Sequence, residues 1–159
     1  MLKIAIVGAT GIVGQQAIVS LIGHPWFKIT KLAASERSAG KNYREALKDA
    51  SGSSRWWCPE ELPGEIGEMP VEDASTFDPA SVDIIFSTMD AGIAKELEPK
   101  YAKTTPVIST ASAFRYEEDT PILIGGVNMD HASLLAVQQK NRGWKGFISP
   151  KSNCTIAGL

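Results

Sequence analysis

The sequence predicts a doubly wound α/β domain built on a mostly parallel sheet. Short runs of β-branched and other apolar residues alternate along the chain with stretches of helical apolar spacing. The first run, residues 3–7, ends in Gly8 and leads directly into a helical pattern over residues 11–22. Because parallel strands need crossover connections that are usually helical, this alternation indicates strand–helix–strand units.

The remaining elements follow in chain order. Pro25 ends the first helix, because the residue before a proline is disfavoured in helical conformation. Residues 35–70 are polar and broken by Gly and Pro, which predicts an irregular excursion with a short helix near residues 43–48. Asn128 or Asp130 is expected to cap the last full helix. Patterning predicts strands over residues 27–34, 82–87, 106–109, 121–124 and 146–149, and helices over residues 91–102 and 130–140.

Length and composition restrict the class of protein. The 159 residues are expected to form one domain spanning 1–159. The formal charge is −2, with no long basic cluster, so no nucleic-acid partner is expected. Cys58 and Cys154 provide neither a disulfide framework nor a metal-type spacing, which favours a cytoplasmic protein without a metal site. No apolar run approaches a membrane span, so no membrane partner is expected.

The first turn has the spacing of a phosphate-binding loop. Gly8-Ala9-Thr10-Gly11-Ile12-Val13-Gly14 carries three glycines, each three residues from the next. One glycine lets the strand turn sharply, another admits a pyrophosphate to the backbone, and the last permits close packing of the helix. The helix N-terminus then faces the phosphates. The motif therefore predicts a Rossmann-like dinucleotide-binding domain, with a plain tight turn as the alternative.

The end of the second predicted strand bears on the choice of cofactor. Glu36 lies near the position at which a carboxylate binds the ribose 2′-hydroxyl of NAD. Arg37, with Ser35 and Ser38 on either side, suits a 2′-phosphate, because a guanidinium forms charge-assisted bonds to phosphate oxygens and the hydroxyls add donors. We therefore favour NADP and interpret Glu36 as a solvated loop carboxylate.

Cys154 is the candidate nucleophile. It stands in Ser152-Asn153-Cys154-Thr155, before a tail over residues 156–159 that is expected to be the first turn of a helix. Unpaired N–H groups at a helix N-terminus favour an ionised thiol. The same amides, together with the Asn153 side chain, could hold an oxyanion. The alternative is a buried structural thiol.

Together these segments resemble aspartate-semialdehyde dehydrogenase, in the branch found in archaea and fungi. The glycine turn, residues 34–40 and residues 152–155 carry the resemblance. It covers the whole chain but only the N-terminal portion of the family's length, ending just after the cysteine. Supporting matches are His24-Pro25-Trp26-Phe27, residues 40–43, residues 83–87, Ser109-Thr110-Ala111-Ser112 with Arg115, and Val127-Asn128 with Asp130-His131.

The resemblance implies reductive dephosphorylation of L-aspartyl-4-phosphate to L-aspartate 4-semialdehyde, a step toward lysine, methionine and threonine. Cys154 would attack the acyl phosphate to form a thioester, which NADPH would reduce. The acyl phosphate is thus the small-molecule substrate, and the family's pattern makes Arg115 the residue that binds its phosphate. The same pattern assigns the cofactor pyrophosphate to Thr10, Gly11, Ile12 and Val13, its 2′-phosphate to Ser35, Arg37 and Ser38, and its far side to Ser87 and Ser109.

The resemblance also implies parts that this chain is expected to lack. Family members carry a second domain after the cysteine, with a histidine base, an arginine for the substrate carboxylate and the dimer interface. The full-length protein is expected to be a homodimer or homotetramer, and the chain alone to bind cofactor without turnover. We expect the strand before Cys154 to lie inside the sheet, and His24 and His131 to cap or pack.

Two departures and two alternatives remain. Thr110 stands where relatives commonly have Asn, and Gly125-Gly126 where archaeal members usually carry Pro-Glu. A related acyl-thioester reductase such as malonyl-CoA reductase would share the glycine turn and the cysteine. A module that binds NADP without catalysis is the other alternative.

Overall fold

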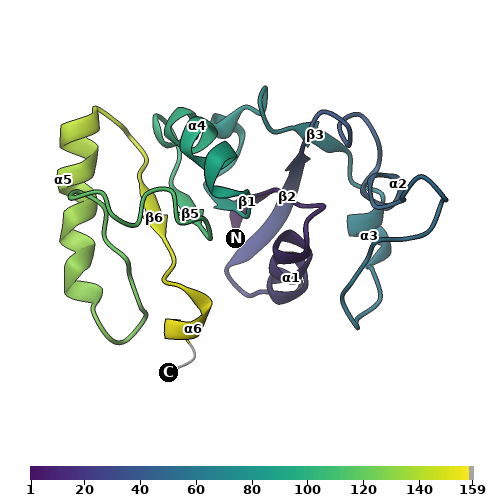
Figure 1. Cartoon of the computed structure of the whole chain (residues 1–159), viewed down its shortest axis with the longest axis horizontal. Helices are drawn as coiled ribbons and strands as arrows, with labels where there is room; N and C mark the ends of the chain where they lie inside the picture. Colours follow the sequence, from purple (N-terminus) through teal and green to yellow (C-terminus); the bar gives the residue numbers. More distant parts are fainter. Residues whose placement is uncertain (158–159) are drawn as a thin grey trace.

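The computed structural model describes residues 1–157, so that Gly158 and Leu159 of the predicted helical tail lie outside the described residues. Its elements alternate between strands and helices, as expected (Figure 1). In chain order they are β1 (Leu2–Val7), α1 (Ile12–Leu21), β2 (Phe27–Ala34), α2 (Tyr43–Ala46), α3 (Gly64–Gly67), β3 (Val71–Asp73), the 3₁₀ helix η1 (Pro79–Ser81), β4 (Ile84–Ser87), α4 (Ala91–Ala102), β5 (Val107–Ser109), the 3₁₀ helix η2 (Met129–Ala132), α5 (Ser133–Arg142), β6 (Ile148–Pro150) and α6 (Cys154–Ala157).

The strands form one parallel sheet in the order β3-β2-β1-β4-β5-β6. This is the strand order of the doubly wound dinucleotide-binding fold, so the predicted fold class is confirmed. The order reverses between β1 and β4. In such sheets the crevice beyond the carboxyl ends of the two strands at the reversal is where ligands bind.

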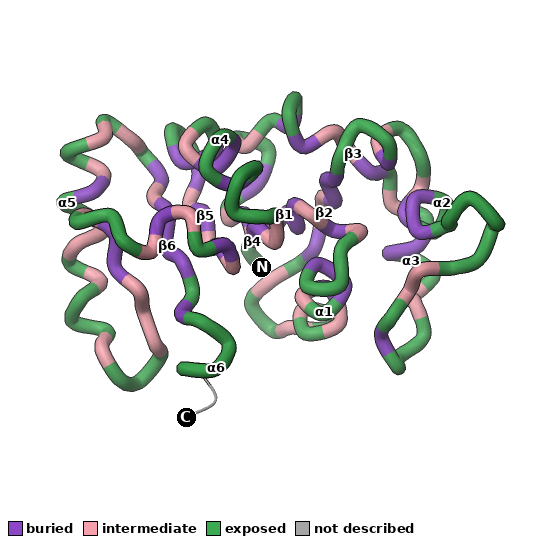
Figure 2. Tube along the Cα trace, in the orientation of Figure 1, coloured by how far each residue is buried: buried purple, intermediate pink, exposed green. Residues whose placement is uncertain are grey.

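Two apolar clusters fill the two faces of the sheet. Because side chains alternate along a strand, Ala5 and Val7 of β1 join a cluster with Leu97 of α4. Ile4 belongs to the other cluster, beneath α1 and the excursion after β2. The buried segments accordingly run through the middle of the molecule, and exposed ones lie around them (Figure 2). Both faces of the central strand are therefore apolar and covered.

The excursion after β2 is more ordered than predicted. It contains the predicted short helix α2 and also α3, and it leads into the edge strand β3; the sequence analysis predicted neither α3 nor β3. A buried glutamine fastens it to α1: the Gln15 amide donates to the carbonyls of Thr10 (3.2 Å) and Arg55 (2.8 Å) and accepts from the N–H of Trp57 (2.7 Å). The excursion thereby supports the start of α1.

The predicted strand over residues 121–124 is wrong. The side chain of Asn128 takes the backbone groups that a neighbouring strand would pair, accepting from the N–H of Ile124 (2.7 Å) and donating to the carbonyl of Ile122 (2.9 Å). The predicted helix at 130–140 begins instead with η2, followed by α5. Asn128 precedes η2 but forms no side-chain cap to it.

The expected interior position of the strand before Cys154 is also wrong. Within residues 1–157, β6 pairs only with β5 and forms an edge of the sheet. None of the described helices is long and apolar enough to cross a membrane.

Candidate active site

The glycine turn has the geometry that its spacing predicts. Gly8 adopts a left-handed conformation (φ +87°), which side chains disfavour, and its carbonyl accepts from the N–H of Gly11 (3.0 Å). A Cβ at Gly14 would collide with the Gly8 carbonyl oxygen and lie 2.8 Å from Cα of Ala9. Only a residue without a side chain therefore lets α1 begin directly against the turn.

Tyr43 of α2 holds the turn from beneath. Its hydroxyl, fully buried, donates to the carbonyl of Ala9 at 2.6 Å. Burial raises the pKa of Tyr43, so the phenol stays protonated and keeps its donor. Sequence reasoning missed this residue. The signal available was an aromatic residue in a predicted short helix with a polar tip that must find a partner when buried.

A cleft of about 570 Å³ opens beyond the turn, at the reversal of strand order. Gly11 precedes α1 without a side-chain cap, and the exposed residues Ile12 and Val13 form the first turn of the helix, leaving its terminal N–H groups to face a ligand. Of the predicted cofactor residues, six line this cleft, namely Gly8, Thr10, Gly11, Ile12, Val13 and Ser35. The structure thus brings together most of the predicted cofactor site.

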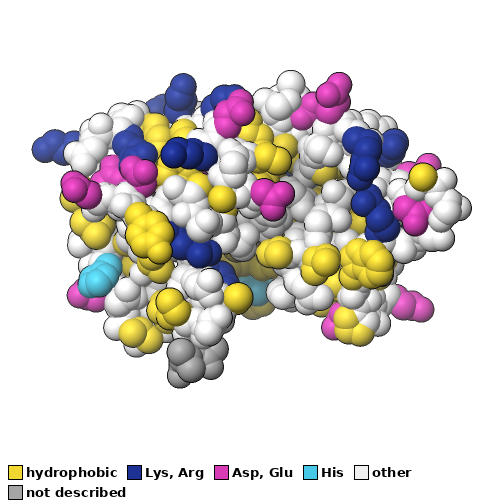
Figure 3. Space-filling model, in the orientation of Figure 1, with side chains coloured by type: hydrophobic (Ala, Val, Ile, Leu, Met, Phe, Trp, Pro, Cys, Tyr) yellow, Lys and Arg dark blue, Asp and Glu magenta, His cyan; other side chains and the backbone are white. Residues whose placement is uncertain are grey.

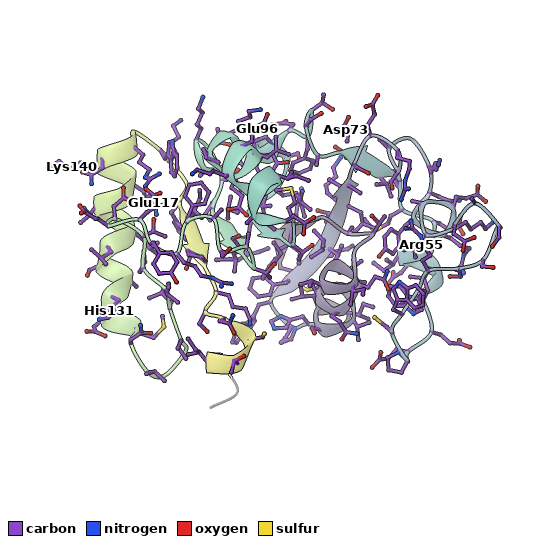
Figure 4. The ribbon with its side chains drawn as sticks, in the orientation of Figure 1. Arg55, Asp73, Glu96, Glu117, His131 and Lys140 are labelled. Carbon is purple, nitrogen blue, oxygen red and sulfur yellow. The ribbon has the colours of Figure 1, made fainter. Side chains whose placement is uncertain are left out.

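Three acidic residues, Glu36, Asp73 and Asp90, line the same cleft. Glu36 is exposed at the end of β2, and Asp73 lies at the end of β3 (Figure 4). Asp73 is partly engaged, because one of its oxygens accepts from the N–H and the hydroxyl of Ser75, both at 2.8 Å. Glu36, the carboxylate whose position would suit the ribose of NAD, is thus one of the residues that line the cleft.

Arg37 and Ser38 face a second hollow of about 310 Å³. The hollow is also lined by three further basic residues, Lys41, Lys48 and Arg55, and by one carboxylate, Asp49. Basic side chains gather on the surface over β3 and α2 (Figure 3), and Arg55 lies beside α2 (Figure 4). The ammonium of Lys41 donates to the carbonyl of Arg37 (3.0 Å). The hollow is strongly cationic and adjoins the cleft through residues 35–38.

Ser87 and Ser109 do not line the cleft. They are the last residues of β4 and β5, are paired in register, and are 0% and 1% exposed. The hydroxyl of Ser109 donates to the carboxylate of Glu98 at 2.6 Å. Their contact with a cofactor stays a prediction.

Arg115 and the segment before Cys154 are tied together. The Arg115 guanidinium donates from Nη2 to the carbonyl of Thr110 (2.9 Å) and from Nε to that of Lys151 (3.0 Å). The N–H of Lys151 in turn donates to the carbonyl of Ser109 (2.7 Å). A cation is thereby fixed to the backbone three residues before the cysteine.

Cys154 is exposed and is the first residue of α6. Asn153 caps the helix, because its side-chain oxygen accepts from the N–H of Thr155 (2.8 Å), and the sulfur of Cys154 lies 3.7 Å from the same oxygen. The side-chain amide nitrogen of Asn153 takes part in neither of these contacts and can donate to another group. The exposure of Cys154 disagrees with the alternative of a buried structural thiol.

The histidines lie elsewhere. His24 stacks on Phe27 with ring centroids 4.7 Å apart, a packing contact. His131 is exposed and projects from the outer side of the molecule at the start of α5 (Figure 4). Among residues 1–157, no group of three or more His, Cys, Asp and Glu could hold a metal ion.

The cleft and the cysteine lie at the same end of the strands. Gly8 follows the carboxyl end of β1 and Cys154 follows that of β6, three strand positions away. At about 4.8 Å per strand, this separates the two strand ends by about 14 Å. Arg115 and Cys154 do not line the cleft itself.

Comparisons with known proteins identify the family and agree with the fold. Residues 3–135 match the family described as semialdehyde dehydrogenase, NAD binding domain. The chain is 44% identical over 160 residues to an aspartate-semialdehyde dehydrogenase of Archaeoglobus fulgidus, covering 99% of this chain and 44% of that protein. It is 37% identical over 158 residues to a malonyl CoA reductase (NADP) of Metallosphaera sedula, covering 99% and 42%. The aspartate-semialdehyde dehydrogenase of Candida albicans, solved with NADP, superposes with a TM-score of 0.84 and 35% identity, covering 100% and 44%.

Proposed function

Because this chain belongs to the semialdehyde dehydrogenase family, we propose that it supplies the cofactor-binding part and the nucleophile of an NADP-dependent aspartate-semialdehyde dehydrogenase. The reaction is the reductive dephosphorylation of L-aspartyl-4-phosphate to L-aspartate 4-semialdehyde. The chain spans 44% of the length of the curated relative from Archaeoglobus. The proposal therefore includes a second domain that provides the general base, the clamp for the substrate carboxylate and the contacts of an oligomer.

The residues of the cleft fit a dinucleotide. Gly14 leaves the space that a Cβ would fill, and the uncapped start of α1 offers N–H groups to a pyrophosphate. The cationic hollow around Arg37 and Lys41 supports NADP, because a 2′-phosphate adds two negative charges that these side chains neutralise. The Candida relative was solved with NADP, which agrees with this choice. Glu36 in the cleft is the feature that would favour NAD instead.

Cys154 and Arg115 carry the acyl transfer. The thiolate of Cys154 attacks the acyl carbon, a C–S bond forms, and the C–O bond to the phosphate breaks. Arg115 holds the departing phosphate, whose charge needs a fixed cation. The N–H groups of the first turn of α6 and the Asn153 amide stabilise the oxygen of the attacked carbonyl. When bound, NADPH supplies the hydride that reduces the thioester, after which Cys154 leaves as a thiolate and the aldehyde is released.

A single observation supports this proposal: Arg115 donates a hydrogen bond to the carbonyl of Lys151, so that its guanidinium lies beside the segment that leads to Cys154. The test is NADPH oxidation by the full-length enzyme with aspartyl phosphate as substrate. Cys154→Ser should remove nearly all turnover while NADP still binds, since the cleft does not include the cysteine. Unchanged turnover in this variant would favour a module that binds NADP without catalysis.

Malonyl-CoA reduction is the second candidate, favoured by the 37% identity to the Metallosphaera enzyme. It uses the same cleft and the same cysteine. Turnover of malonyl-CoA in place of aspartyl phosphate by the full-length protein would select it. The chain of 159 residues by itself should bind NADP and show no dehydrogenase rate, and normal turnover of this chain would contradict the assignment of base and clamp to a second domain.

A further inference from the structure

Glu98 is a buried carboxyl group that the proposed reaction does not use. It lies on the inner face of α4, near Ala94 and Tyr101 in helical spacing, and is 0% exposed. Burial raises the pKa of Glu98, and the neighbouring hydroxyls of Ser109 and Ser87 oppose that shift. No salt bridge to Glu98 is found among residues 1–157. A buried acid without a counter-ion is costly, so its place in the core calls for a physical reason.

The contacts of Glu98 lead to the ends of two strands. One oxygen accepts from the Ser109 hydroxyl at 2.6 Å. The other oxygen and the hydroxyl of Ser87 are both buried, and within the described part of the chain neither has a hydrogen-bond partner. Ser87 and Ser109 are register partners at the carboxyl ends of β4 and β5. Glu98 therefore lies beneath the point where β5 passes into the loop of Arg115.

Ser109 transmits this contact to the loop. Because its hydroxyl hydrogen goes to Glu98, its oxygen is oriented to accept the N–H of Ala111 (3.0 Å). That bond fixes the turn in which the carbonyl of Thr110 receives Arg115. The backbone carbonyl of Ser109 receives the N–H of Lys151 (2.7 Å). One serine thus joins Glu98 to both segments that hold the Arg115 guanidinium.

We propose that Glu98 is a positioning residue: by fixing the Ser109 hydroxyl, it sets the turn over residues 109–111 and so holds the Arg115 guanidinium beside the cysteine segment. The function lies in the hydrogen-bond acceptor of Glu98 and does not need its charge. Glutamine preserves that acceptor and adds an N–H donor for Ser87. Alanine removes both.

The experiment reads the charge near Cys154 without substrate or cofactor, so its outcome is independent of the proposed reaction. Cys154 of the purified chain is alkylated at low ionic strength with iodoacetate, which is anionic, and separately with iodoacetamide, which is neutral. Peptide mass spectrometry measures each rate at Cys154, apart from Cys58. The ratio of the two rates reports the positive charge held near the sulfur and falls toward that of a free thiol at high salt.

Glu98→Ala and Ser109→Ala should each lower the iodoacetate-to-iodoacetamide ratio by about twofold, the effect of losing one unit charge about 8 Å away in water. The double variant should fall no further, because both changes break one path. Glu98→Gln should retain the wild-type ratio. The direction of the change in Glu98→Ala separates two effects. Loss of the negative charge of Glu98 alone would raise the iodoacetate-to-iodoacetamide ratio, whereas displacement of Arg115 lowers it.

Thr105→Val is the matched control. Thr105 is also buried, its hydroxyl bonds the carbonyl of Pro79 (2.7 Å), and it lies before β5, away from the cysteine. Its ratio should stay at the wild-type value. A wild-type ratio in Ser109→Ala, an equal fall in Thr105→Val, or a fall in Glu98→Gln as large as in Glu98→Ala would overturn the proposal. Circular dichroism establishes folding, and Ser109→Ala decides the result if Glu98→Ala does not fold.

Discussion

Replacing Gly14 by alanine should damage both the stability of the fold and cofactor binding. The added Cβ would meet the backbone of Gly8 and Ala9, which cannot rotate away as a side chain would. Overpacking of this kind costs about 3 kcal/mol at its upper end. The better helix propensity of alanine returns up to about 1 kcal/mol. The net loss is about 2 kcal/mol, or about 4–8 °C in Tm for a chain of this size.

Thermal unfolding with and without NADP measures both effects. At a ligand concentration 100 times its Kd, binding should stabilise the wild-type chain by about 2.7 kcal/mol. Gly14→Ala should lose most of this gain, because α1 can no longer start against the turn. Gly92→Ala is the matched control in the first turn of α4: apart from its chain neighbours and the nearby backbone of its own helix, no atom lies within 4 Å of its Cβ position, so the variant should keep the NADP response and gain up to about 1 kcal/mol. A wild-type Tm and NADP response in Gly14→Ala would refute the packing argument.

Three further changes test separate contacts. Tyr43→Phe should lower the free energy of unfolding by about 1–3 kcal/mol in urea titrations, because the buried carbonyl of Ala9 loses its donor; an unchanged midpoint would contradict this. Arg37→Ala should weaken NADP about tenfold in calorimetry and leave NAD unchanged, a difference of about 1.4 kcal/mol; equal weakening of both would exclude a 2′-phosphate contact. Arg142 forms an ion pair with Asp119 (2.6 Å), and its hydrogen bonds hold the pKa of Asp119 below its usual range. The stabilisation from that carboxylate is therefore complete above its unfolded pKa of about 3.9 and is lost as the pH falls through the lower folded value. The stability gap between wild type and Asp119→Asn in urea should accordingly be wide at pH 7 and narrow at pH 2, and an equal gap at both would count against the ion pair.

The sequence predicted those elements whose signal is local. β1 and β2 are apolar runs bounded by turns, and α4 was placed at its observed bounds. β3 was missed because it has three residues and only one, Val71, is apolar; its place in the sheet depends on pairing with Leu32 and its neighbours in β2. The strand expected at 121–124 was predicted wrongly for the opposite reason. Its residues are apolar, but their backbone groups bond to the side chain of Asn128 and not to a neighbouring strand.

The candidate site shows the same division. The glycine turn could be placed from spacing alone, since each glycine answers a local steric need. The separation of Arg37 from Ser35 into two hollows could not, because it depends on how residues 41–55 fold against the turn. From the sequence alone, Glu98 is one of several charged residues in a helix that is expected to lie at the surface. Its spacing from Ala94 and Tyr101 places it on the buried face, and that was the available signal.

The hydrogen bonds of Gln15 to the excursion fix the length of one part of that loop and leave the length of another part unconstrained. Its amide engages Arg55 and Trp57 on the two sides of one residue, so an insertion there would break contacts on both. The tip at Gly52 is exposed, and its turn is held by local hydrogen bonds to Asp49 and between the hydroxyls of Ser51 and Ser53. A reporter peptide or affinity tag grafted at the tip should leave the cofactor cleft undisturbed, whereas the same graft four residues later should loosen it.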